Sequence, residues 1–548
     1  MKETISSSKL LAASPACVWR RFFSIAIPLA LIGLVFLSLA QATSKKMHRN
    51  LTWGAYPDFE SMSVAISDMV YHLDQGYLAY GKIIELFDKR LGVNTPPGEI
   101  PHLQRMTDAG YINATIREAT SLDHISIIGP SHPLDFSPII RRDLVPVEAE
   151  DVGRIDYYRA AFSLFGFRIQ SMHFLFFLVL MITTLLFIVG FNGQIVPLGV
   201  LAANLIAVNL VINSTLFFDG LPSISAYRAV SALAIIPVSH LIFCVFNRAR
   251  LWSAAGFSSL GQIAIFIFVL WARSSAQWGF AAVLLATLFV AMRQRAWRRF
   301  RSLTLWPLAA LIAGELALSI YVHNALSPAY FTDELLPSHF TWHSAYLGLN
   351  VHPKFSFPEN GDAIAFLPAA KYIAEHRPDL PEAAPLTNGY WLRLHDEVVR
   401  HLFLNFALAH PQYMLELYAR WKPTRFFDIY VDAMKPLLHG LVFAGLAAIV
   451  ILGSAATLLL RTAWRQMSFD ALTITAITAL ASYIPIMWAY PARHVMVDSV
   501  WTTTTFLLLL AVTAGGAVIR LVLVLANRPA PIWRFRKRSS LSFGRPSL

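Results

Sequence analysis

Long apolar runs alternate with short polar segments over most of the chain. Ten of these runs are long enough, or nearly so, to cross about 30 Å of hydrocarbon as helices. The pattern predicts an all-α polytopic membrane protein with about ten spans. The run at 278–292 is short for a span, so nine or eleven spans remain possible. The predicted spans are residues 22–41, 173–191, 195–216, 228–246, 254–271, 278–292, 305–322, 437–460, 470–489 and 500–525.

Two polar intervals, 42–172 and 323–436, are far longer than the other connections. Helical spacing of apolar positions predicts two short amphipathic helices within 57–92 and further helices at 363–376, 391–409 and 411–421. Aromatic residues of the second interval are expected to rest on the outer membrane face: Tyr390, Trp391, Phe403, Phe406, Tyr413, Tyr418 and Trp421. The predicted organisation is an N-terminal segment (1–21), a first span (22–41), a first large loop (42–172), spans two to seven (173–322), a second large loop (323–436), spans eight to ten (437–525) and a basic tail (526–548).

The distribution of charge predicts the orientation of these spans. If the N-terminus is cytoplasmic, the cytoplasmic segments carry nineteen Lys and Arg and one acid, whereas the short outer loops carry two Arg. The two large loops then lie outside and hold 28 of the 33 acids. Both termini are therefore expected in the cytoplasm. Ala40-Gln41-Ala42 also fits a signal-peptidase site, whose use would leave the outer loops in place.

Composition excludes several classes of protein. With 56% hydrophobic residues, 14% charged residues and a mean hydropathy of +0.52, the chain is too apolar for an ordinary soluble protein. The net charge of +12 comes from short basic segments between apolar runs, with no basic stripe on a soluble domain, so nucleic acid is not an expected partner. Cys17 and Cys244 provide no disulfide framework, and no Walker or dinucleotide-binding motif occurs.

An acidic pair, Asp58 and Glu60, follows the first predicted span closely and is the expected chemical centre. Either carboxylate can act as a general base, and two neighbouring carboxylates also suit Mg²⁺ or Mn²⁺. Asp58 has a second interpretation as the N-cap of the helix after Pro57. No cofactor is certain from the sequence, and a divalent cation stays open.

Two arginines lie at the expected outer boundary of their spans. Arg228 enters the span at 228–246, and Arg493 precedes the last span, so either can bind a phosphate bidentately or can reach the interface as a structural residue. We expect a cavity between the two large outer loops that opens laterally to the membrane and is lined by Asp58, Arg228 and Arg493. Asp156 and Tyr157, just before the second span, are expected to line the same cavity.

Histidine and glutamate add two further hypotheses. His339 and His343 have the spacing of two ligands on one helix, so metal binding, contact with the acceptor or sugar, and interfacial packing all remain open for His343. Glu315 lies inside an apolar run, where a charge is costly, and is expected to face the interior of the bundle.

Residues 154–191 resemble the segment that enters the second span of polytopic GT-C glycosyltransferases, including the protein O-mannosyltransferase and aminoarabinose transferase groups. Tyr157-Tyr158, Leu164-Phe165-Gly166 and the following Arg168 carry the resemblance. A long first outer loop with an early acid and the late sequence YPARHVMV at 490–497, similar to the Pro-x-Arg-Tyr of those families, agree with it.

The resemblance implies an enzyme of the cell envelope, in a bacterial inner membrane, that takes a sugar from a polyprenyl-phosphate donor. The sugar would pass to a lipid, glycan or protein acceptor on the outer face. Asp58 would be the base, and Arg493 with His494 would contact the donor. The chain departs from these families in two places: Phe59 separates Asp58 from Glu60, and His494 replaces Tyr. Glu60 therefore stays an alternative base.

Two other functions are compatible with the pattern. A transporter or flippase for a lipid-linked molecule would contain inverted repeats with broken spans, and no such repeat is found in the sequence. A non-catalytic envelope assembly protein would use its outer loops for binding alone.

Overall fold

A computed structural model describes the protein at residues 15–46, 65, 151, 153–166, 169–214, 229–294, 305–325, 341–355, 363–377, 389–435, 464–489 and 496–526, and at positions 445, 447, 450, 451 and 454. All regular elements among these residues are helices, and none of these residues forms a strand. The described chain is thus all-helical, as predicted.

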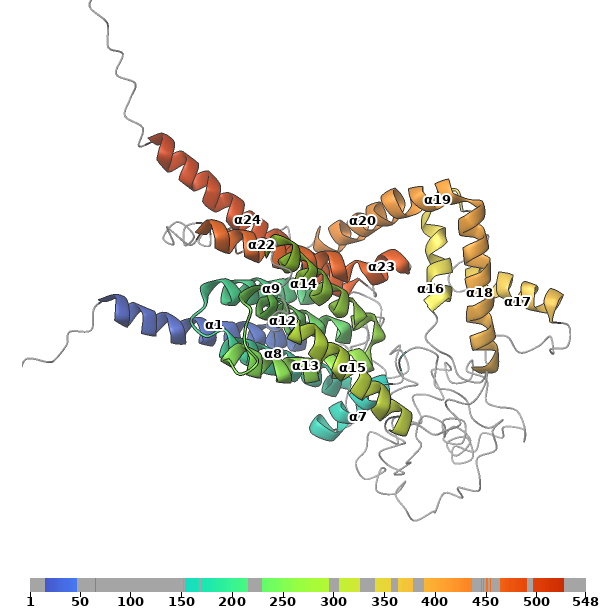
Figure 1. The fold of residues 1–548 in the computed structure, drawn as a ribbon, viewed down its shortest axis with the longest axis horizontal. Helices are drawn as coiled ribbons and strands as arrows, with labels where there is room; N and C mark the ends of the chain where they lie inside the picture. Colours follow the sequence, from blue (N-terminus) through green and yellow to red (C-terminus); the bar gives the residue numbers. More distant parts are fainter. Residues whose placement is uncertain are drawn as a thin grey trace, which may run out of the picture.

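The larger part of the structure is a bundle of apolar helices (Figure 1). Its elements are α1 (Pro15–Lys46), α7 (Gly153–Phe165), α8 (Ile169–Gly190), α9 (Ile195–Asn213), η3 (Val230–Ala234), α12 (Ile235–Asn247), α13 (Ala254–Ala272), η4 (Ser274–Gln277), α14 (Trp278–Gln294), α15 (Trp306–Ala325), α22 (Trp464–Ser482), α23 (Ile484–Trp488) and α24 (Val497–Ala526).

Nine stretches of the described helices are long and apolar enough to cross a membrane, and each overlaps one predicted span. The run at 278–292 reaches span length because η4 precedes it, so the candidate span covers Ser274–Arg293. The remaining predicted span, 437–460, lies largely outside the described residues. A polytopic helical membrane protein is therefore supported by length and composition.

The helix α12 lies at the centre of the bundle. Its residues from Ile235 to Val245 are all buried, against α8, α13, α14 and α22. Its polar groups meet neighbours across the interface with α13: His240 Nε2 lies 3.0 Å from the Ala255 carbonyl, and Cys244 Sγ lies 3.3 Å from Ser259 Oγ. These two side chains of α12 thus meet partners on a neighbouring helix, as expected in an environment without water.

The first turns of α24 carry buried hydroxyl groups that connect it to its neighbours. Thr505 donates to Asn204 of α9, and Ser499 donates to the Ser482 carbonyl of α22. Further contacts of this kind join Ser482 with Thr502, Tyr483 with Thr503, and Tyr430 with Thr504. We call these residues of α24, together with Asp498, the polar collar.

A second, smaller unit comes from the second large loop. It consists of α16 (Thr341–Leu347), η6 (Gly348–Val351), α17 (Ala363–His376), α18 (Gly389–Ala409), α19 (Pro411–Glu416), the π-helical turn η7 (Leu417–Trp421) and α20 (Lys422–Met434). The predicted helices at 363–376, 391–409 and 411–421 are present, and the break falls at Pro411 as expected.

The aromatic residues of this unit contribute to its own core. Phe403 is buried, and Phe406, Tyr413, Tyr418 and Trp421 pack against the same cluster. Burying a side chain such as Phe403 contributes about 1.5–3 kcal/mol to folding. The other four side chains stay partly exposed, so their contact with the outer membrane face stays a prediction. The side chains of Tyr390 and Trp391 lie outside the described residues.

Two ends of the bundle can be distinguished in Figure 1. The ends of α1 and α24 nearest the chain termini point to the left in Figure 1, and α16–α19 lie on the right. We call the opposite end the α7 end. There η3 contacts η4 and α24, and Asp151, just before α7, accepts a hydrogen bond from Ser274 of η4. Our sequence-based topology predicts that the α7 end faces outward, and this orientation stays a prediction.

Candidate functional site

Five of the eight predicted site residues lie outside the described residues. These are Asp58, Glu60, Arg228, Arg493 and His494. The predicted cavity between them, and the Mg²⁺ or Mn²⁺ site at the acidic pair, therefore stay predictions. Described residues that follow two of these site residues in the sequence are in contact with each other. Ser231, just after Arg228 in the sequence, donates a hydrogen bond of 2.8 Å to Asp498, just after His494.

Asp498 is the centre of a polar network at the α7 end. Its carboxylate is buried and accepts hydrogen bonds from Ser231 Oγ at 2.8 Å and from Trp278 Nε1 at 2.9 Å. The positive charge of Arg273 also acts on it. A buried carboxylate is tolerated only with donors and a nearby cation, and Asp498 has both.

Arg273 joins this network to a second buried carboxylate. Its guanidinium lies 3.1 Å from Asp151, with only 10% and 4% of the two side chains exposed. Asp151 also accepts a hydrogen bond from the backbone N–H of Ser274 at 2.9 Å. Arg273 is thus paired with Asp151, and its charge also acts on Asp498 without a direct contact in the described structure. We call Asp151, Arg273 and Asp498 the buried charge cluster.

Asp156 lies beside this cluster on α7, as part of a more exposed pair. It accepts a hydrogen bond from Trp271 Nε1 at 2.8 Å and lies 3.6 Å from Arg159. The approach of α7 to α13 needs Gly153, because a Cβ there would lie 2.1 Å from the Trp271 carbonyl oxygen. Asp156 therefore lies at the α7 end, and its expected place in the lining of the cavity stays a prediction.

Tyr157 is packed inside the bundle. It is 0% exposed, its hydroxyl donates to the Met172 carbonyl at 2.8 Å, and its ring stacks on Phe268. These contacts attach α7 to α8 and α13. The proposed contact of Tyr157 with a substrate stays a prediction, and its observed partners are all structural.

His343 lies in the core of the second unit. Its Nδ1 faces His395 Nε2 at 3.0 Å, and the ring of Phe366 packs against both imidazoles. Asp396 accepts hydrogen bonds from the backbone N–H groups of Trp342 and His343, at 3.0 Å each, and so caps the start of α16. Of the alternatives for His343, this placement favours packing.

Acid is expected to loosen this histidine pair. Burial, together with the neighbouring His343, lowers the pKa of His395 from 6.5 to about 3. The unfolded chain therefore binds a proton between pH 6.5 and about 3 that the folded chain does not, so stability falls as the pH falls through this range. Tryptophan fluorescence of the purified protein should report an acid transition below pH 6.5.

His395→Gln should weaken that transition, because it removes the group that takes up the proton. The matched control is His376→Gln, on the exposed end of α17, which should leave the transition unchanged. An acid transition that persists unaltered in His395→Gln would contradict this account.

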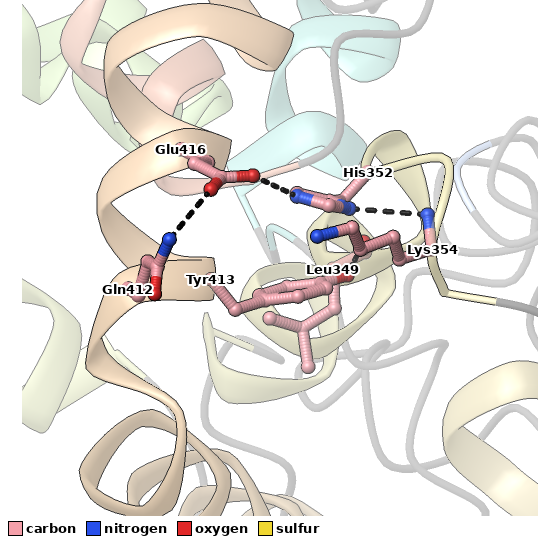
Figure 2. Close-up of polar contacts among 6 residues, drawn as sticks. All are labelled: Leu349, His352, Lys354, Gln412, Tyr413 and Glu416. Atoms are coloured by element: carbon pink, nitrogen blue, oxygen red, sulfur yellow. Dashed lines mark hydrogen bonds and ion pairs between the residues drawn. The ribbon is translucent and has the colours of Figure 1, made fainter.

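A further polar contact secures the surface of the second unit (Figure 2). The His352 imidazole lies 3.2 Å from Glu416, accepts the backbone N–H of Lys354, and stacks on Tyr413 with ring centroids 4.0 Å apart. The hydrogen bond from His352, and another from Gln412, lower the pKa of Glu416. The group ties η6 to α19 and has the character of a structural clamp.

Metal binding has no support from the residues that the structure describes. No group of three or more His, Cys, Asp or Glu side chains within the described ranges is arranged to hold a metal ion. The divalent cation proposed for Asp58 and Glu60 depends on residues beyond those ranges.

Sequence reasoning missed the buried charge cluster and His395. One signal was present: Asp498 stands at the start of a long apolar run, and a charge at a membrane-spanning segment is costly enough to indicate a partner. Arg273 is the basic residue of a very short predicted outer loop. The partners of these residues come from distant parts of the chain, which the local pattern does not reveal.

Searches against protein families, curated proteins and solved structures find no match to this chain. The resemblance to GT-C glycosyltransferases therefore rests on the sequence motifs described above.

Proposed function

We propose that the protein is a membrane glycosyltransferase that moves a sugar from a polyprenyl-phosphate donor to an acceptor on the outer face of the membrane. The observation that best supports this proposal is the position of the buried charge cluster. Asp151, Arg273 and Asp498 lie at the α7 end, where the segments that carry Arg228 and His494 join the bundle.

The cluster acts as a scaffold in this proposal. Its carboxylates are already bound by donors, so it fixes the ends of the helices from which the reactive segments leave. A rigid, charged end suits a reaction that needs cations around a phosphate and a carboxylate near an acceptor.

In the proposed reaction, an acceptor hydroxyl attacks the anomeric carbon of the donor sugar. Its proton passes to Asp58, a new carbon–oxygen bond forms, and the bond between the anomeric carbon and the phosphate oxygen breaks. The polyprenyl phosphate leaves with the bonding electron pair, and Arg228 and Arg493 stabilise its charge. Glu60 is the alternative base.

The location of charge also bears on the transporter alternative. Transporters of lipid-linked molecules bind their substrate near the middle of the membrane, at broken helices. In the described part of the bundle, the fully buried Asp and Arg side chains lie at the α7 end, and Glu315 is a half-buried acid in mid-span. This arrangement favours chemistry at one membrane face over transport through the middle.

Incubation of the purified protein with radiolabelled polyprenyl-phosphate sugars and candidate acceptors tests the proposal. We expect one donor to lose its sugar to an acceptor. Movement of an intact lipid-linked sugar across proteoliposomes, with no transfer, would replace the enzyme by a flippase. Absence of both activities with the full panel would favour an assembly protein.

The same proposal requires the α7 end to face outward. Single cysteines at positions 110 and 380 should react with a membrane-impermeant maleimide from outside, and a cysteine at position 540 should be protected. Reaction at position 540, or protection at position 380, would reverse the topology.

A further inference from the structure

Lys422, the first residue of α20, lies buried between the second unit and the bundle. It is 0% exposed, and its ammonium group lies 4.4 Å from the centre of the Tyr418 ring. Nζ donates hydrogen bonds to two backbone carbonyls at the end of α23, at 2.5 Å to Met487 and at 3.1 Å to Trp488. One lysine from the second unit therefore caps a helix of the bundle.

The environment of Lys422 is unusual for a cation. No carboxylate forms an ion pair with it in the described part of the chain, and the neighbours of Nζ are helix-end carbonyls and an aromatic face. Carbonyls at the C-terminal end of a helix carry partial negative charge, which favours a cation there.

A neighbouring glycine shows how closely the two parts approach. A Cβ at Gly348 would lie 2.8 Å from Lys422 Nζ and 2.8 Å from the Ala489 carbonyl oxygen. Trp488 adds a second connection, because its Nε1 donates to the Thr341 carbonyl at 3.0 Å and its ring lies 5.0 Å from Trp342. The end of α23 is thus held by α16, η6 and α20 together.

We propose that Lys422 is a positioning residue that fixes the end of α23 against the second unit. The chain continues from α23 directly into the segment with Arg493 and His494, which we assign to the phosphate of the donor. The inference thus rests on the proposed function. Contacts between the second unit and α23 fix the end of this helix, and the end of α23 in turn sets where the segment assigned to the donor phosphate begins.

The stability of the contact between Lys422 and α23 should depend on pH. Burial lowers the pKa of Lys422 from 10.5 to about 7. The titratable side chain in contact with Nζ is Tyr418. The other neighbours, α23 and η6, contribute backbone carbonyl groups and Gly348. Between pH 7 and pH 10.5 the unfolded lysine binds a proton that the folded one has lost, so the group favours the folded contact more as the pH rises through 7. A neutral amine retains two N–H donors for the two carbonyls.

The test compares Lys422→Met with the control Lys435→Met, in which an exposed lysine just beyond α20 is changed. Methionine keeps the apolar stem and removes the charge and the donors. In a background carrying Ala489→Cys, Lys422→Met should raise the rate of maleimide modification about tenfold, the effect of about 1.4 kcal/mol of lost local stability. Lys435→Met should leave the rate unchanged.

Two further measurements distinguish a positioning role of Lys422 from a general effect on the stability of the protein. With Lys422 present, modification of Ala489→Cys, measured relative to a cysteine at position 435, should slow as the pH rises through about 7, and Lys422→Met should remove this dependence. In the transfer assay, Lys422→Met should raise KM for the donor about tenfold while KM for the acceptor stays unchanged. If Lys422→Met unfolds, Lys422→Gln, which keeps an N–H donor, replaces it and should show smaller effects in the same direction.

The outcomes also distinguish this inference from the proposed function. Unchanged labelling in Lys422→Met would overturn the role of Lys422, whatever the enzyme does. Increased labelling in a protein that transfers no sugar would support the anchor and refute the glycosyltransferase. Increased labelling with an unchanged donor KM would overturn the link between α23 and the donor phosphate.

Discussion

The Asp58→Asn variant is expected to insert and fold normally but to transfer sugar about 10²- to 10⁴-fold more slowly than the wild type. An acceptor hydroxyl must lose its proton as it bonds to the anomeric carbon, and a carboxylate placed beside it supplies an effect of this size. Asparagine keeps the shape and much of the capping ability of aspartate but accepts no proton. The measurement is the initial rate of sugar transfer at equal amounts of folded protein.

Glu60→Gln is the matched control for this prediction, because it neutralises the neighbouring carboxylate. If Asp58→Asn keeps near-normal turnover and Glu60→Gln abolishes it, Glu60 is the base. Full activity in both variants would leave this segment as the start of a helix and remove the main residue-level support for the enzyme. Asp58→Ala should also lose about 1 kcal/mol of stability with the missing cap.

Arg273→Ala should destabilise the bundle by about 3–5 kcal/mol, because it leaves the buried carboxylate of Asp151 without its cation. Arg159→Ala is the matched control. It breaks a pair with Asp156 whose side chains are 44% and 25% exposed, and should cost no more than about 1 kcal/mol. Thermal unfolding in detergent, followed by tryptophan fluorescence, measures both.

A double variant tests the energy of the Arg273–Asp151 pair more directly. Asp151→Ala in the Arg273→Ala background should recover part of the lost stability, because the unpaired carboxylate of Asp151 is then removed and Asp498 keeps its two hydrogen-bond donors. Equal losses of stability in Arg273→Ala and Arg159→Ala would contradict the burial of the Arg273–Asp151 pair, because they would mean that water reaches it.

The helices of this protein follow from local sequence, whereas its long-range pairs do not. The run at 254–271 became α13, and the predicted break at Pro411 separates α18 from α19, since apolar spacing and proline act over a few residues. Asp498, by contrast, binds Ser231 and Trp278, which are 267 and 220 positions away. No local pattern encodes that choice of partner.

His343 illustrates the same limit within the second unit. The sequence offered His339, one helical turn away, as its neighbour. The structure pairs His343 with His395, 52 positions further along, because α16 and α18 pack together. A helical spacing predicts which residues share a face, and the packing of helices decides which faces meet.

The polar collar of α24 has a consequence for how the protein is made. Among the described helices α24 is last in the sequence, so the ribosome completes it after α9, α14 and α22 have been synthesised. Until then Asn204, Trp278 and Ser482 lack the partners that α24 brings. Polar groups without hydrogen-bond partners are costly in lipid, and chaperones and membrane proteases act on chains that are incompletely folded. The collar therefore links survival of the nascent chain to arrival of its last described helix.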